Sequence, residues 1–127
     1  RFFVKFLSVD NKNGPIQEGF MAETAFVKVA KVGELSPGDM KMVEFGDDQI
    51  LLANVGGHIY ACDNICTHAF FPLAEGDLDG EQVECPLHGS VFNVTTGQAT
   101  GPPADENLRV FQVRIDGKDI LVGPPAS

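Results

Sequence analysis

The chain contains two short runs, Cys66-Thr67-His68 and Cys85-Pro86-Leu87-His88, separated by sixteen residues, that decide its fold and its chemistry. Each run offers one thiolate and one imidazole in the same order, with the cysteine first and the histidine second. Two loops that face each other would therefore place two sulfurs at one level and two nitrogens at another. A single tetrahedral metal has no need of this layering, whereas two metal ions held by different ligands require it.

A [2Fe–2S] cluster with two cysteines on one iron and two histidines on the other has this ligand set. The spacing Cys-x-His, sixteen residues, Cys-x-x-His closely resembles that of the Rieske family. The resemblance extends from Met21 almost to the end of the chain and implies one Rieske-type [2Fe–2S] cluster. On this resemblance Cys66 and Cys85 bind one iron, and His68 and His88 bind the other.

Two other interpretations of these residues stay open. Two cysteines and two histidines also form structural zinc sites, although zinc ligands are typically separated by two to four residues and only one separates Cys66 from His68. The residues could instead be core cysteines and hydrogen-bonded histidines with no common role. The chain has three Cys and three His in all, and four of these six residues belong to the pattern, which disfavours coincidence.

The residues after the second run also resemble the family's cluster site. Ser90 matches a hydroxyl group that donates to a cluster sulfur in the respiratory branch of the family. Pro102-Pro103 resembles the loop that shields the cluster, and two adjacent prolines make such a loop stiff because each fixes φ. A second Gly-Pro-Pro run, Gly123-Pro124-Pro125, is expected to be an ordinary surface loop.

The chain departs from the respiratory branch in ways that predict a low potential. That branch has a disulfide across the two loops, but Leu87 and a residue at or beside Phe71 hold those places here. Phe92 stands where that branch has a Tyr hydroxyl. Hydrogen bonds to sulfur favour the reduced cluster, so the loss of a donor lowers the potential. We expect a midpoint toward the bottom of the Rieske range of roughly −150 to +300 mV.

The rest of the sequence predicts an all-β fold. Apolar runs at 26–29, 40–43, 50–55, 59–61, 108–115 and 120–122 alternate with Gly, Pro and Asp turn signals, of which Gly56-Gly57 and Asp116-Gly117 predict hairpins. Helical structure is expected only as one short turn near Leu73-Ala74. The pattern predicts small antiparallel sheets, and the resemblance implies the Rieske fold. That fold is a basal β-sandwich or barrel with an inserted cluster-binding subdomain, here at about residues 62–103.

With 127 residues the chain is expected to form one domain, a Rieske domain over residues 21–127. Residues 1–20 fall outside the resemblance and are interpreted as an extension or a vector-derived segment. Cys62 is interpreted as a packed residue at a strand end and His58 as a solvated turn residue. The chain has no run of eighteen apolar residues, so no membrane span is predicted. Its three cysteines are too few for a disulfide framework. We therefore expect a monomer in the cytoplasm.

The charge of the chain limits the kinds of partner it can bind. The net charge is −9, and ten residues hold five acidic side chains with no basic one between them: Glu75, Asp77, Asp79, Glu81 and Glu84. Nucleic acids and anionic membranes are disfavoured as partners. The acidic run could simply be a solvated loop, or it could steer the protein toward basic surfaces of redox partners.

The resemblance implies a soluble ferredoxin of bacterial aromatic-ring dioxygenase systems rather than an enzyme. Such a carrier takes electrons from an FAD-containing NAD(P)H ferredoxin reductase and passes them to a terminal oxygenase. An accessory Rieske subunit of another system, such as the small subunit of a nitrite reductase or a multicomponent monooxygenase ferredoxin, stays open. The Rieske domain of an oxygenase itself is disfavoured. A 2-His-1-carboxylate iron site needs two more histidines, and only His58 remains.

Overall fold

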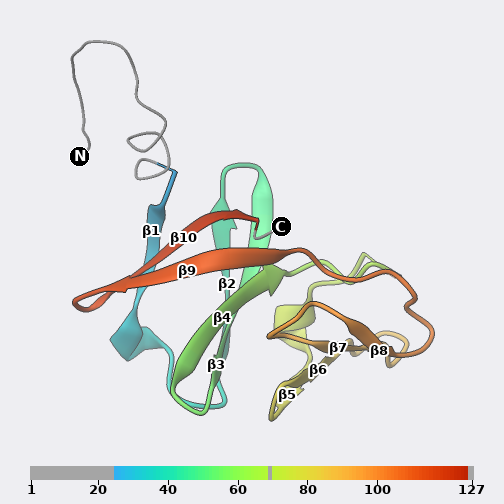
Figure 1. Cartoon of the computed structure of the whole chain (residues 1–127). Coiled ribbons are helices and arrows are strands. Elements are labelled where there is room, and N and C mark those ends of the chain that lie inside the picture. Colours follow the sequence, from blue (N-terminus) through green and yellow to red (C-terminus); the bar gives the residue numbers. More distant parts are fainter. Residues whose placement is uncertain (1–24, 69, 126–127) are drawn as a thin grey trace.

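The structure, a computed structural model, describes residues 25–68 and 70–125. The predicted extension at residues 1–20 lies outside this part of the chain. Ten β-strands and two short 3₁₀ helices form the described part, so the all-β prediction is confirmed (Figure 1). No helix in these ranges is long and apolar enough to cross a membrane.

The larger sheet contains six antiparallel strands. Its order is β1 (Val27–Lys31), β10 (Asp119–Pro125), β9 (Val110–Asp116), β4 (His58–Asp63), β3 (Asp48–Val55) and β2 (Met40–Phe45). The two edge strands, β1 and β2, approach each other, so the sheet is nearly closed. The 3₁₀ helix η1 (Val32–Glu34) connects them, and it was not expected from the sequence.

The smaller sheet is inserted between β4 and β9. It contains four antiparallel strands in chain order: β5 (Asp77–Asp79), β6 (Gln82–Glu84), β7 (Val91–Asn93) and β8 (Ala99–Gly101). The 3₁₀ helix η2 (Leu73–Glu75) precedes it, where one helical turn was predicted. Figure 1 shows this sheet beside the large one; the chain enters it after the end of β4 and leaves it toward the start of β9.

The predicted hairpins form with two-residue loops. Val55 pairs with His58 across Gly56-Gly57, and both glycines have positive φ, of 60° and 97°. Asp116 pairs with Asp119 across Gly117-Lys118, and Gly117 has a φ of 64°. Two-residue hairpin loops need this backbone conformation, which explains why glycines mark the strand ends so clearly in the sequence.

Strand β3 joins the two hydrophobic cores. Successive side chains of a strand point to opposite faces. Leu51 therefore packs in the core beneath the small sheet, whereas Ile50 and Leu52 pack inside the large one. All three are fully buried. A strand buried on both faces reads as a continuous apolar run, which explains the sequence around these residues.

One expectation about the fold is wrong. Gly123-Pro124-Pro125 is not a surface loop, because β10 continues to Pro125, which pairs with Phe111 after a register shift. Gly123 is buried, and a Cβ atom there would lie 2.8 Å from the ring of Phe26. The glycine is thus required by close packing against an aromatic ring, and the sequence pattern of a turn does not distinguish this case.

Candidate metal centre

The first predicted ligand loop follows β4 and is closed by two backbone hydrogen bonds. The N–H of Cys66 donates to the carbonyl oxygen of Phe71 at 2.9 Å, and the N–H of Phe70 donates to that of Cys66 at 2.8 Å. Phe70 has a φ of 53°, the only positive value of a non-glycine residue in the described ranges. The loop therefore turns back on itself immediately after His68.

The second loop follows β6 and repeats this pattern. The N–H of Cys85 donates to the carbonyl oxygen of Ser90 at 2.8 Å, and the N–H of Gly89 donates to that of Cys85 at 3.0 Å. Gly89, four residues after its cysteine like Phe70, has a φ of 81°. The two loops thus share one backbone hydrogen-bonding pattern, and in each of them the histidine follows the cysteine in sequence.

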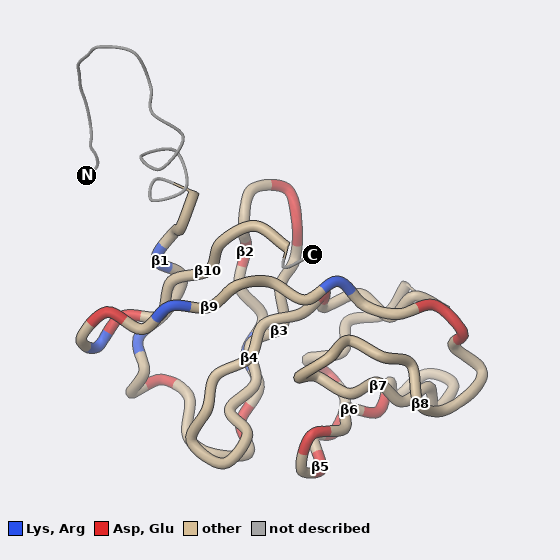
Figure 2. Tube along the Cα trace, viewed as in Figure 1, with Lys and Arg blue, Asp and Glu red and all other residues tan. Residues whose placement is uncertain are grey.

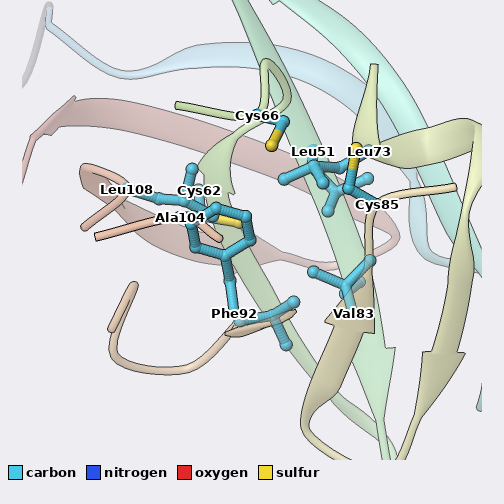
Figure 3. Packing of buried hydrophobic residues seen from close by; sticks show 11 residues of the cluster. Leu51, Cys62, Cys66, Leu73, Val83, Cys85, Phe92, Ala104 and Leu108 are labelled. Atoms are coloured by element: carbon cyan, nitrogen blue, oxygen red, sulfur yellow. The ribbon is translucent and has the colours of Figure 1, made fainter. Parts of the chain in front are cut away.

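The cysteines of the two loops meet inside the protein. Cys66 and Cys85 are both fully buried, and their side chains are within hydrogen-bonding range of each other. Burial raises the pKa of the Cys85 thiol, while the backbone N–H groups of Leu87 and His88 lower it. Figure 3 shows both sulfurs at one end of the buried cluster, away from Phe92 and Val83. N–H groups directed at a sulfur suit a thiolate ligand.

The histidines of the two loops meet at the surface. The rings of His68 and His88 are 5.3 Å apart between centroids and 71° apart in plane, and both residues are exposed. The four predicted ligands therefore lie as two pairs, thiol beside thiol and imidazole beside imidazole. In residues 25–68 and 70–125, no three Cys, His, Asp or Glu side chains surround one point as a single metal ion would require. The pairing suits a group with two differently ligated metal atoms.

Ser90 provides an independent test of this fit. Its hydroxyl oxygen is fully buried and accepts a hydrogen bond from the N–H of Ala104 at 3.1 Å. Within the described part of the chain, no acceptor is present for the hydroxyl hydrogen of Ser90. Buried donors are rarely left unpaired. A sulfur of a bound cluster would supply the missing acceptor, so the residues present fit a [2Fe–2S] group.

The third loop bears the predicted Pro102-Pro103 pair. Both prolines are exposed, and the peptide bond between them is cis. Ala104, directly after them, is buried and bonded to Ser90, which attaches this loop to the second ligand loop. Thr67, between the ligands of the first loop, donates to the carbonyl oxygen of Glu106 at 2.8 Å. The segment after the prolines therefore contacts both ligand loops.

Two contacts that position the first ligand loop were not predicted from the sequence. The first involves Asn64, a buried residue two positions before Cys66. Its side chain donates to the Gln49 side chain at 3.2 Å and accepts a hydrogen bond from the N–H of Ala74 at 2.9 Å. Arg109 donates to Asp63 at 2.7 Å across 46 residues. A polar residue just before a ligand run could have indicated the first contact. The second depends on two strands that only the fold brings together.

The remaining cysteine and histidine lie as expected. Cys62 is buried in β4, and burial followed by the charge of Asp63 raises the pKa of its thiol to about 12, so it stays protonated. His58 is exposed at the start of β4, beside the Gly56-Gly57 turn. Cys62 belongs to the same buried cluster as Cys66 and Cys85 but lies on β4 rather than in a ligand loop.

Comparison with known proteins gives consistent matches. A profile of the Rieske [2Fe-2S] domain matches residues 25–112. The ferredoxin component of biphenyl 2,3-dioxygenase from Rhodococcus jostii is 44% identical over 98 residues, which cover 77% of this chain and 92% of the relative. A naphthalene 1,2-dioxygenase ferredoxin component from Pseudomonas aeruginosa is 37% identical over 70% of this chain and 86% of its own. These relatives are ferredoxin components of dioxygenase systems.

Solved structures agree. The ferredoxin of carbazole 1,9a-dioxygenase from Nocardioides aromaticivorans matches with a TM-score of 0.75 and 35% identity, covering 79% of this chain and 98% of that one. A chain from a complex of reduced oxygenase and oxidized ferredoxin of carbazole 1,9a-dioxygenase matches with a TM-score of 0.74 and 35% identity. The match covers 78% of this chain and 93% of that one. The Rieske fold that the sequence implied is thereby confirmed.

Proposed function

The chain belongs to the Rieske [2Fe–2S] domain family, and from this premise we propose that it carries single electrons within a ring-hydroxylating dioxygenase system. It receives them from an FAD-containing NAD(P)H ferredoxin reductase and delivers them to a terminal oxygenase. The support is the close similarity to ferredoxin components of such systems over nearly their whole length. A domain over residues 21–127 and a location in the cytoplasm, where free cysteines stay reduced, belong to the same proposal.

Of the four residues assigned to the cluster, two lie in the interior and two lie at the surface. Cys66 and Cys85 would hold one iron inside the protein, and His68 and His88 would hold the other at the surface. When bound, a [2Fe–2S] group accepts and releases one electron. The two exposed imidazoles would bring one iron close to a docked partner, while the buried thiols would hold the other iron away from solvent.

One observation carries this proposal: in the same two loops the thiols of Cys66 and Cys85 form a buried pair and the imidazoles of His68 and His88 form an exposed pair. The test is anaerobic stopped-flow spectroscopy with the reductase and oxygenase of the biphenyl 2,3-dioxygenase system. The visible spectrum of the protein should bleach when reductase and NADH are added and return when oxidised oxygenase follows. A colourless protein that contains zinc, or one that the reductase cannot reduce, would refute the proposal.

The distribution of charge supports protein partners with basic surfaces. Residues 64–108 hold seven acidic side chains and no basic one. Most basic residues lie on the large sheet or its turns instead, such as Lys28, Lys31 and Lys118. Figure 2 shows acidic segments over β5 and β6 and basic ones along β1, β9 and the β9–β10 turn. A charge asymmetry of this kind turns the cluster end toward a cationic partner as it approaches.

Charge reversal should slow this encounter. The double substitution Glu75→Lys and Asp77→Lys changes two exposed carboxylates on the small sheet's side. We expect the second-order rate of oxygenase reduction to fall about tenfold at low ionic strength, because steering contributes about 10–1,000-fold to such rates. At about 1 M salt, where the screening length is about 3 Å, variant and wild type should converge.

The matched control is Glu44→Lys with Asp116→Lys, which makes the same change in net charge on the large sheet. Stopped-flow rates across a salt series should leave this control near the wild type. Equal losses in both variants would show that only net charge matters, and no loss in either would remove steering from the proposal.

The hydroxyl of Ser90 should raise the potential of the bound cluster. In Ser90→Ala the buried donor is removed, and the more negative reduced cluster loses more than the oxidised one. A midpoint about 60 mV lower is expected, equivalent to a tenfold change in a one-electron equilibrium. Protein-film voltammetry measures this, with Ser36→Ala, an exposed serine on the large-sheet side, as the control. A midpoint unchanged in Ser90→Ala would show that the hydroxyl does not reach the cluster.

A further inference from the structure

The shared design of the two ligand loops makes Phe70 anomalous. Each loop needs a left-handed residue four positions after its cysteine, and the second loop has Gly89 there, with a φ of 81°. The first loop has Phe70 in this conformation, with a φ of 53°. For a side chain with a Cβ this conformation costs free energy, and a glycine would avoid the cost. The isolated protein gains nothing in backbone geometry from a phenylalanine.

Packing does not compensate for this strain. Phe70 is 80% exposed, the most exposed of the large apolar side chains in the described part of the chain. Leu87, in the second ligand loop, is 49% exposed. In the free protein, Phe70 therefore exposes an apolar ring to water and also holds a strained backbone conformation. Backbone strain of this kind is often found at functional residues.

The place of Phe70 indicates what it contacts. It lies two residues after His68, and Leu87 directly precedes His88, so an apolar side chain adjoins each of the two exposed imidazoles in sequence. Phe70 also lines a cleft of about 400 Å³ together with carboxylate side chains. A partner that covers the histidines must therefore cover Phe70 as well.

The cleft beside Phe70 adds charge to this contact. Arg109 pairs with Asp48 at 3.1 Å and with Asp63 at 2.7 Å. No Lys or Arg of the described ranges pairs with Asp47 or Glu106, the other acidic residues of the cleft. A partner with a basic residue next to an apolar pocket would match both features.

We propose that Phe70 is the anchor that docks this protein onto its terminal oxygenase, by inserting its ring into an apolar pocket whose rim carries a Lys or Arg facing Asp47 and Glu106. The proposal rests on the proposed function and deepens it, because it names the residue that selects the partner. Aromatic anchors that fill a pocket dominate the energetics of many interfaces. The free protein bears the strain, and the complex recovers it through burial of the ring.

The test compares Phe70→Gly with Phe70→Leu in the cluster-loaded protein. In stopped-flow reduction of the biphenyl 2,3-dioxygenase oxygenase, Phe70→Gly should raise the concentration needed for half-maximal rate about tenfold, which is the effect of losing one hot-spot side chain. Phe70→Leu keeps an apolar anchor and should recover most of the affinity. The limiting rate, the midpoint potential and the slope of rate against salt should stay unchanged, because neither the cluster nor the steering charges are altered.

The matched control is Ile115→Thr, which removes an apolar side chain 48% exposed on β9, remote in sequence from both ligand loops. It should leave oxygenase reduction unchanged. A partner-free measurement accompanies it: relief of the left-handed conformation should leave the unfolding midpoint of Phe70→Gly equal to or above that of the wild type. A lower midpoint would show that Phe70 has a structural role and would overturn the proposal.

The remaining outcomes separate the two proposals. If the wild type holds no reducible cluster or does not reduce the oxygenase, the proposed function fails. If the wild type reduces it and Phe70→Gly does so with equal affinity, only the anchor fails. A loss confined to reduction of the variant by the reductase would likewise overturn the assignment to the oxygenase.

Discussion

Substitution of His88 by cysteine should lower the midpoint potential of the bound cluster by about 100–300 mV. Ferredoxin clusters with four thiolates lie near −400 mV, while those with two histidines lie at about −150 to +300 mV. One thiolate in place of a neutral imidazole makes one of the two changes that separate these classes. The added negative charge sits on the exposed side of the site, where His68 and His88 meet. Voltammetry and the EPR spectrum of the reduced protein measure the change.

The control for this substitution is His58→Cys. His58 is the third histidine of the chain, exposed at the start of β4 and separate from the imidazole pair. Its replacement should leave both the spectrum and the potential as they are. A His88→Cys protein with the wild-type EPR spectrum would show that His88 is not a ligand, and the Cys66, His68, Cys85, His88 assignment would have to be abandoned.

The sequence predicted the parts of this structure that depend on local pattern. The hairpins at Gly56-Gly57 and Gly117 are encoded by adjacent residues with a fixed backbone requirement, and both were predicted. The prediction failed at Gly123, where a glycine is needed because the backbone packs closely against the ring of Phe26, 97 residues away in sequence. Packing between distant segments leaves no local signal, so a Gly-Pro pair reads as a turn in either case.

The same division applies to the candidate site. The order Cys, His, Cys, His predicted which side chains meet, because one ligand pattern in two short loops is a local feature. The Arg109–Asp63 contact spans 46 residues and was not predicted. In the sequence alone, nothing distinguishes Phe70 from the other apolar residues beside the ligand runs. Its left-handed backbone became apparent from the hydrogen bonds that repeat those of the Gly89 loop.

Substitution of Gly97 by alanine should destabilise the cluster-loaded protein by about 3–4 kcal/mol, a large part of the 5–15 kcal/mol typical of a domain. Gly97 is buried, with a φ of 79°, which costs an alanine about 1–2 kcal/mol. Its Cβ would also collide with the carbonyl oxygen of Leu108 and lie 2.9 Å from Val110. Forcing an extra carbon into a filled space adds about 1–3 kcal/mol. Urea unfolding gives the free energy of unfolding directly.

Gly46→Ala separates the two causes. Gly46 has a similar φ of 62°, but open space surrounds the position of its Cβ. It should therefore lose only the conformational part, about 1–2 kcal/mol. The Gly97 variant should in addition lose its cluster sooner to an iron chelator, because Leu108 donates to the Gly97 carbonyl oxygen at 2.7 Å and is followed by Arg109, which holds Asp63 near the first ligand loop. Equal destabilisation of the two variants would mean that the 97 and 108 segments separate at little cost, contrary to the close contact in the fold.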